Sequence, residues 1–109
     1  MKLNEVRDKA HATSSSNGFW DAPDPNIPEK LALIHSEVSE ALEEIRSGGP
    51  TSGVHYTEAG KPEGFASELA DVIIRVGDLC GHLGIDLEEI VRIKMEYNAS
   101  RPYKHGRKF

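Results

Sequence analysis

The chain has 109 residues, of which 38% are hydrophobic and 28% are charged, and its net charge is −5. This length predicts a single domain over residues 1–109, and the composition excludes a fully disordered chain. The apolar runs, such as Leu31-Ala32-Leu33-Ile34 and Val72-Ile73-Ile74, are too short for a transmembrane helix. The single cysteine excludes an internal disulfide framework and a cysteine-rich zinc site.

The N-terminal residues carry charges where a signal peptide has an apolar stretch, so we expect a cytoplasmic protein without a membrane partner. A domain of this size buries only about 60–65% of the surface that its unfolded chain exposes. A single copy is therefore expected to be marginally stable.

Charge is distributed unevenly along the chain. Residues 92–109 hold six Lys and Arg against one acid, whereas the other 91 residues hold seven bases and 17 acids. This basic part, which ends in a basic tail at residues 102–109, could touch nucleic acid. It could also supply cations to a phosphate-bearing ligand beside an acidic metal site. The alternative is a solvated basic end without a partner.

The N-terminal half predicts two helices. Residues 2–13 read as a weak helix, and three prolines make residues 21–28 an extended connection whose Pro28 suits the first turn of a helix. Residues 28–47 predict a long helix, because their apolar residues follow the 3.6-residue period up to Gly48-Gly49-Pro50.

The C-terminal half predicts two more helices. Residues 48–61 lack a period and contain four glycines, so they form either a mobile lid or a small hairpin. Pro62 opens a second long helix to about Leu83, in which small residues that include Gly77 and Gly81 would allow close approach of another helix. Asp86 and Glu89 resemble a capping box for a last helix that ends near Ser100. The expected fold class is all-α, with two long and two shorter helices.

Two pairs of carboxylates lie on the two long helices. Glu37 and Glu40 point the same way at the border of the first apolar face, and Glu68 and Asp71 lie on the narrow polar stripe of the second helix. If the apolar faces pack antiparallel, the two pairs meet at the seam. The alternative is two exposed acidic faces that bind nothing.

Four carboxylates in one place need a counter-charge. Two of them about 5 Å apart repel by about 3 kcal/mol at an effective dielectric of about 20, which is a large part of a small domain's stability. Arg75 could offset some of this repulsion, and a hard divalent cation would offset more. Mg²⁺ favours carboxylate oxygens and keeps positions open for phosphates, whereas Zn²⁺ would want His or Cys nearby.

Two further groups are candidates for binding a ligand. Lys94, Asn98 and Arg101 form a row that points in the same direction as the apolar side of the last helix, which suggests a polar cleft where the cations bind phosphates. The alternative is a helix that outruns the core and leaves this row exposed. Phe19-Trp20 lies in a loop, where Trp20 could stack on a base or, as the sequence favours, plug the end of the bundle.

The acidic pairs occur in the segments LIHSEVSEALE (residues 33–43) and ELADV (residues 68–72), with 27 residues between Glu40 and Glu68. These segments resemble the Glu-x-x-Glu and Glu-x-x-Asp signature of the MazG-like nucleotide pyrophosphohydrolases, which belong to the all-α NTP pyrophosphatase superfamily. The tail KMEYNASRPYKHG (residues 94–106) and the loop GFWD (residues 18–21) are similar to the corresponding segments of small members. The resemblance covers roughly residues 15–108.

The resemblance implies a four-helix MazG-like bundle that is completed by oligomerisation, as a homodimer or homotetramer. It also implies Mg²⁺-dependent hydrolysis of (deoxy)nucleoside triphosphates to the monophosphate and pyrophosphate, a housekeeping reaction of the nucleotide pool. The metal would be held by Glu37, Glu40, Glu68 and Asp71. One of them, Glu37 or Glu40, would also orient or deprotonate the attacking water.

The resemblance assigns the remaining candidates to the substrate. Lys94, Asn98 and Arg101 would bind phosphates or sugar, and Trp20 with Phe19 would stack on the base. Ser36 stands where many relatives have a further Glu, which leaves the number of metal ions open.

Two other functions stay open. A phosphoribosyl-ATP pyrophosphohydrolase would share the superfamily and the chemistry but not the substrate. A non-catalytic helical module would bind a partner or nucleic acid through the basic tail, although the acidic body would repel a phosphate backbone and makes nucleic acid the less favoured ligand.

Overall fold

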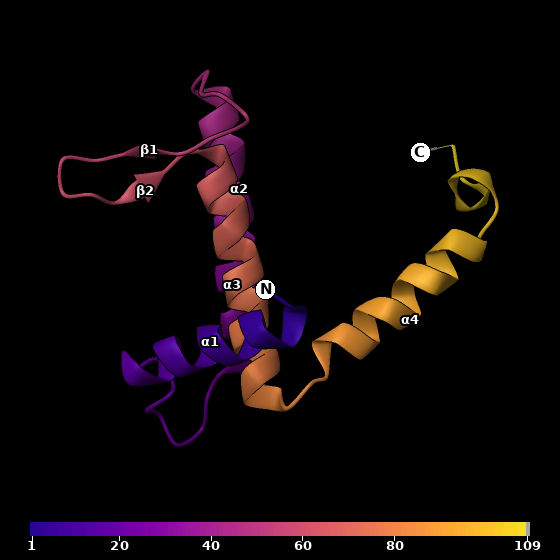
Figure 1. Cartoon of the computed structure of the whole chain (residues 1–109), viewed down its shortest axis with the longest axis horizontal. Helices are drawn as coiled ribbons and strands as arrows, with labels where there is room; N and C mark the ends of the chain where they lie inside the picture. Colours follow the sequence, from indigo (N-terminus) through magenta and orange to yellow (C-terminus); the bar gives the residue numbers. More distant parts are fainter. Residues whose placement is uncertain (109) are drawn as a thin grey trace.

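The structure, a computed structural model, describes residues 1–108, so Phe109 of the expected basic tail lies outside the described residues. Over this part of the chain it contains four α-helices, a two-stranded hairpin and a short 3₁₀ helix (Figure 1). The all-α fold class is therefore confirmed. The elements in chain order are α1 (Leu3–Ser16), α2 (Ile27–Arg46), β1 (His55–Tyr56), β2 (Pro62–Glu63), α3 (Phe65–Leu83), α4 (Leu87–Ser100) and η1 (Tyr103–Gly106).

The two long helices α2 and α3 pack side by side and run in opposite directions (Figure 1). The start of α2 is capped by Asn26, whose side chain accepts a hydrogen bond from the Glu29 backbone N–H at 3.1 Å. The end of α3 is set by Gly84, which has a left-handed φ of 69°. This antiparallel pair is the arrangement that brings the acidic borders of both helices to one seam.

Helix α1 crosses the lower half of α3 at its small residues (Figure 1). A Cβ atom added to Gly81 would lie 2.6 Å from Cβ of His11, and one added to Gly77 would lie 3.3 Å from Cα of Arg7. The two helices can approach this closely only because α3 has no side chains there. The expected role of Gly77 and Gly81 in close helix packing is confirmed.

The connection between α2 and α3 forms a hairpin, which is one of the two alternatives that the sequence left open. His55 pairs with Glu63 and Tyr56 with Pro62 in an antiparallel register. The prediction that α3 begins at Pro62 is wrong, since Pro62 lies in β2 and the helix begins at Phe65. Proline restrains the residue before it to extended backbone, and this favours a strand at that point over a helical turn.

Helix α1 is longer than expected and includes the serines that the sequence suggested as a breaker. Ser14, Ser15 and Ser16 are helical, and the helix ends at Asn17 and Gly18. Serine is only mildly unfavourable in a helix, so packing against α3 can override its local preference.

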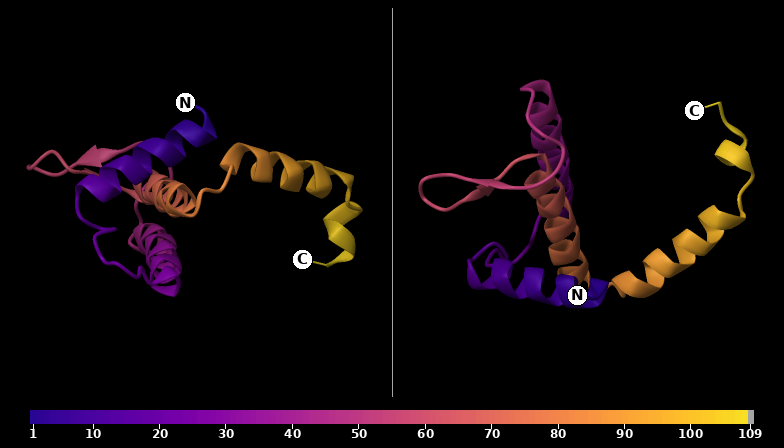
Figure 2. Two further views of the ribbon diagram at one scale, coloured as in Figure 1. Left: turned by 90° about the horizontal axis from the view of Figure 1, so that it is seen from below. Right: turned by 45° about the horizontal axis from the view of Figure 1, so that its top comes forward.

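Among the described residues, the hydrogen bonds between α4 and the other helices lie at its first turn. Asp86 caps the helix by accepting from the Glu89 backbone N–H at 3.2 Å, as the sequence predicted. Asn4 of α1 contacts the same end, because its Oδ1 accepts from the N–H groups of Leu87 at 3.0 Å and Glu88 at 3.2 Å. Beyond this point α4 projects away from the other helices (Figures 1 and 2), and none of its residues is buried. A bundle of four packed helices is therefore not assembled within one chain.

The single chain is unusually open. It exposes 8128 Å², whereas a folded protein of its mass of 12.0 kDa exposes about 6,000 Å². Its radius of gyration is 16.4 Å, against about 13 Å for a compact domain of this length. Large apolar residues stay exposed on three helices: Leu31, Val38, Leu42 and Ile45 of α2, Leu69, Ile73, Ile74 and Leu83 of α3, and Ile90, Ile93, Met95 and Tyr97 of α4.

Among the described residues, no helix combines the length and hydrophobicity that crossing a membrane requires.

Candidate functional site

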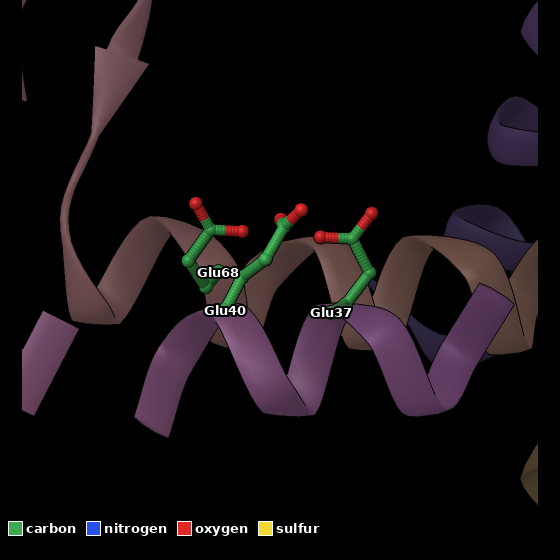
Figure 3. A group of neighbouring side chains, drawn as sticks. All are labelled: Glu37, Glu40 and Glu68. Atoms are coloured by element: carbon green, nitrogen blue, oxygen red, sulfur yellow. The ribbon is translucent and has the colours of Figure 1, made fainter. Parts of the chain in front are cut away.

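Three carboxylates meet at the seam between α2 and α3. Glu37 and Glu40 come from successive turns of α2 and Glu68 comes from the first turn of α3, and all three point into the same space (Figure 3). One oxygen of each lies within 4.8 Å of one oxygen of each of the others. The structure therefore brings together three of the four carboxylates that the sequence singled out.

Two oxygens of this group are buried without a partner. Glu37 is only 8% exposed, and among the described residues its Oε2 and the Oε2 of Glu68 are buried and accept no hydrogen bond. A carboxylate oxygen removed from water without compensation is costly. Two such atoms in one group of three carboxylates fit a hard divalent cation, which prefers this type of ligand.

Arg75 of α3 partly neutralises the group. Its Nε donates to Oε1 of Glu37 at 2.8 Å. Burial by itself favours the neutral form of Glu37, but the hydrogen bond from Arg75, the close contacts with Glu68 and Glu40 and the Arg75 charge together outweigh it. The pKa of Glu37 is consequently lowered, so that this carboxyl is held ionised.

Glu68 behaves in the opposite way. Burial, followed by the close approach of the Glu40 and Glu37 carboxyls and their negative charges, raises the pKa of Glu68 to about 7. Without a metal ion, the carboxyl of Glu68 is therefore only partly ionised near neutral pH. The two carboxyls therefore differ in charge state near neutral pH. Glu37 is held ionised by Arg75, whereas Glu68 is close to its titration point.

Asp71, the fourth expected metal ligand, lies outside the group of three. It sits one turn after Glu68 on α3, and burial followed by the charge of Glu37 raises its pKa. The charges of Arg75 and Lys61 act in the opposite direction. Lys61 directly precedes β2, so the hairpin connection places a cation near the site. The sequence analysis did not identify this lysine.

A cavity of about 760 Å³ lies between α1, α2 and α3 and adjoins the carboxylates. Its lining is mostly apolar, with Val6, Leu33, Ile73 and Ile74 among the residues. Glu37, Asp71 and Arg75 also line it, so that the charged side chains of the seam face an apolar space. This space is open to solvent in the single chain, and Ile73 and Ile74 in its lining are about half exposed.

Trp20 finds its partners within the chain. Its Nε1 donates to Oδ1 of Asp78 at 2.8 Å, and its ring stacks on His82 with centroids 4.0 Å apart. The ammonium of Lys30 lies over the same ring, 4.4 Å from its centroid. This arrangement favours the plugging role that the sequence also allowed, while base stacking by Trp20 stays a prediction. Phe19 is 66% exposed and lines the cavity.

The structure does not bring Lys94, Asn98 and Arg101 to the carboxylates of the same chain. All three lie on or at the end of α4, which projects away from the α2–α3 pair (Figure 2). The two cations instead lie near the ring of Tyr97, at 5.3 Å for Lys94 and 5.6 Å for Arg101. Within one chain the row matches the exposed alternative, because α4 outruns the three packed helices.

Sequence reasoning missed the polar cluster around Asp78. Oδ1 of this residue pairs with Nδ1 of His11 at 3.0 Å in addition to Trp20. A signal was present, because Asp78 and His82 continue the polar stripe that holds Glu68 and Asp71 on an otherwise apolar helix.

Comparison of the chain with models of protein families, with curated proteins and with solved structures finds no match.

Proposed function

We propose that Glu37, Glu40 and Glu68 hold Mg²⁺ and that the protein hydrolyses nucleoside triphosphates to the monophosphate and pyrophosphate. The observation that carries the proposal is the pair of buried, unpartnered carboxylate oxygens in the group of three. The resemblance of the two acidic segments to the MazG-like signature supplies the reaction. Asp71 would join the ligands through a change of its side chain or a bridging water.

The residues of the seam suit the chemistry that this reaction needs. Mg²⁺ held there would polarise the α-phosphate and offset its developing negative charge. Glu40 is exposed and has no hydrogen bond to a cation among the described residues, so it can accept a proton from the attacking water. The water oxygen bonds to the α-phosphorus, the bond from that phosphorus to the bridging oxygen breaks, and pyrophosphate leaves. Glu37 is less suited to this task, because Arg75 stabilises its ionised form.

We also propose that a second copy of the chain covers the exposed apolar faces. The excess surface is about 2,100 Å² per chain, and two copies together would bury about 4,200 Å², which lies within the range of obligate homodimers. The basic part of the chain, from residue 92 on, complements the acidic remainder in charge. In such a dimer or tetramer, α4 of one copy is the element free to bring Lys94, Asn98 and Arg101 to the carboxylates of another.

The test is pyrophosphate release from a panel of NTPs, dNTPs and phosphoribosyl-ATP, with Mg²⁺ and with EDTA. We expect Mg²⁺-dependent release that falls roughly 100-fold or more in Glu40→Gln. Glu43→Gln is the matched control, because Glu43 is an exposed glutamate of the same helix outside the group.

The outcomes separate the alternatives. Release from phosphoribosyl-ATP alone would favour that narrower activity. A folded protein that releases pyrophosphate from no substrate would contradict the proposal and favour the non-catalytic binding module.

A further inference from the structure

The ion pair between Arg75 and Glu37 occupies an oxygen that the metal site would use. Nε of Arg75 lies 2.8 Å from Oε1 of Glu37, while the other oxygen of Glu37 is buried without a partner. One oxygen of this carboxylate is therefore paired with Arg75, and the other is free to bind a cation. A guanidinium and a divalent cation placed on the same carboxylate group repel each other and compete for its charge.

Arg75 is also able to leave. Its side chain is 40% exposed, whereas that of Glu37 is 10% exposed. The arginine can therefore swing while the glutamate stays in place. Arg75 lies one turn from both Asp71 and Asp78 on α3, and all three line the same cavity as Glu37. A released guanidinium would have the carboxylate of Asp78 on its own helix and the cavity mouth within reach.

We infer that Arg75 is an internal counter-cation that holds Glu37 in the metal-free protein and is released when a divalent cation enters the carboxylate group. The inference rests on the proposed metal site and adds how that site is loaded. Arg75 is in this sense a positioning residue, since it acts through Glu37. Without metal, the positive charge of Arg75 offsets the repulsion among the three carboxylates. The same charge weakens metal binding, because Arg75 and the metal compete for Glu37.

The first test compares Mn²⁺ and Mg²⁺ affinity by calorimetry in the wild type, in Arg75→Gln and in Arg46→Gln, with folding checked by circular dichroism. Arg46 is exposed at the end of α2 and is absent from the ion pairs found among the described residues, so its variant controls for the loss of one positive charge. We expect Arg75→Gln to bind metal roughly tenfold more tightly than the wild type, and Arg46→Gln to change affinity far less. A purely structural role for Arg75 predicts the opposite sign, because a disordered Glu37 would bind metal more weakly.

A second measurement is made on the wild-type protein and needs a variant only to assign one signal. The Nε–H of Arg75 can be followed by NMR in the wild-type protein, with its signal assigned through Arg75→Lys. We expect this proton to exchange slowly without metal and to lose its protection when Mg²⁺ is added.

Each result has a separate meaning. Metal binding that is equal or weaker in Arg75→Gln, or an Arg75 signal that Mg²⁺ leaves unchanged, overturns the inference and leaves the proposed metal site intact. Failure of both the wild type and Arg75→Gln to bind either ion overturns the metal site itself, and the inference with it.

Discussion

The rings of Trp20 and His82 lie flat against each other, with centroids 4.0 Å apart and planes inclined by 9°. His82 belongs to the last turn of α3 and Trp20 to the loop after α1. The stack therefore joins the N-terminal part of the chain to the far end of the long helix pair. Asp78 completes it by accepting from Trp20 and pairing with His11 through the same oxygen.

We expect Asp78→Ala to lower the free energy of unfolding by about 1–3 kcal/mol, because it leaves the partly buried Trp20 N–H without an acceptor. Urea unfolding followed by circular dichroism measures this change. Asp8→Ala is the control, since Asp8 is 66% exposed in its ion pair with Arg7, and its loss should change stability by less than about 0.5 kcal/mol. Equal effects of the two substitutions would contradict the structural role of this cluster.

The raised pKa of Glu68 predicts that metal-free protein loses stability as the pH increases. Below about 4.5 both folded and unfolded states hold the proton, and above about 7 both release it. Between these values the folded state binds more protons, so the free energy of unfolding falls as the pH rises through this window.

The variant Glu68→Gln isolates this effect, because it removes the titrating group. In EDTA we expect its urea midpoint to match the wild type near pH 5 and to exceed it near pH 8. Glu43→Gln should follow the wild type at both values. If the difference between the urea midpoints of the wild type and Glu68→Gln is the same at both pH values, the pKa of Glu68 is not raised.

The exposed apolar faces predict that the chain is an oligomer in solution. Light scattering after size-exclusion chromatography should give at least twice the mass of 12.0 kDa. The double substitution of Ile90→Asp and Ile93→Asp on α4 should shift the mass toward a single chain, because both side chains are about half exposed in one copy and a charge in a buried interface is strongly unfavourable.

Glu96→Lys is the matched control for this experiment. Glu96 lies about 90° around α4 from the midpoint of Ile90 and Ile93. It pairs with Arg92 on the surface, and exposed pairs of this kind contribute little. The oligomer should persist in this variant. A wild-type mass of one chain at micromolar concentration would rule out the proposed interface.

Local sequence pattern was sufficient for most of the helical framework. The 3.6-residue period of apolar residues placed α2 to within a residue, and Asp86 correctly marked the start of α4. The same period placed Glu37 and Glu40 together at one border of α2, whereas their meeting with Glu68 was conditional on the antiparallel packing that the structure shows. These features depend on neighbours within one or two turns, so the sequence contains them directly.

Other features depend on contacts between distant segments and could not be read from the pattern. The connection before α3 was predicted only as a lid or a hairpin, because the hairpin depends on the pairing of Tyr56 with Pro62 across its turn. The contacts of the Trp20 indole with Asp78 and His82, which favour the plugging role, also could not be predicted from the sequence. Asp71 has the i, i+3 spacing from Glu68 that places both on one stripe of α3, but it lies outside the group of three carboxylates. The spacing predicts a shared face of the helix and not the direction of each side chain.

The direction of α4 separates most clearly what the sequence predicts from what only the tertiary structure shows. The apolar residues of α4, such as Ile90 and Ile93, are expected to be buried against another surface. The sequence pattern does not predict which surface that is. Asn4 hydrogen-bonds Leu87 and Glu88 at the start of α4, Arg7 hydrogen-bonds the carbonyl of Ile85 just before it, and the rest of the helix extends away from its own chain (Figure 1). Helix formation follows from interactions along a few residues of sequence. The separation of Lys94 and Arg101 from the carboxylates depends on how α4 is placed against residues more than 70 positions away, and only the folded structure contains that information.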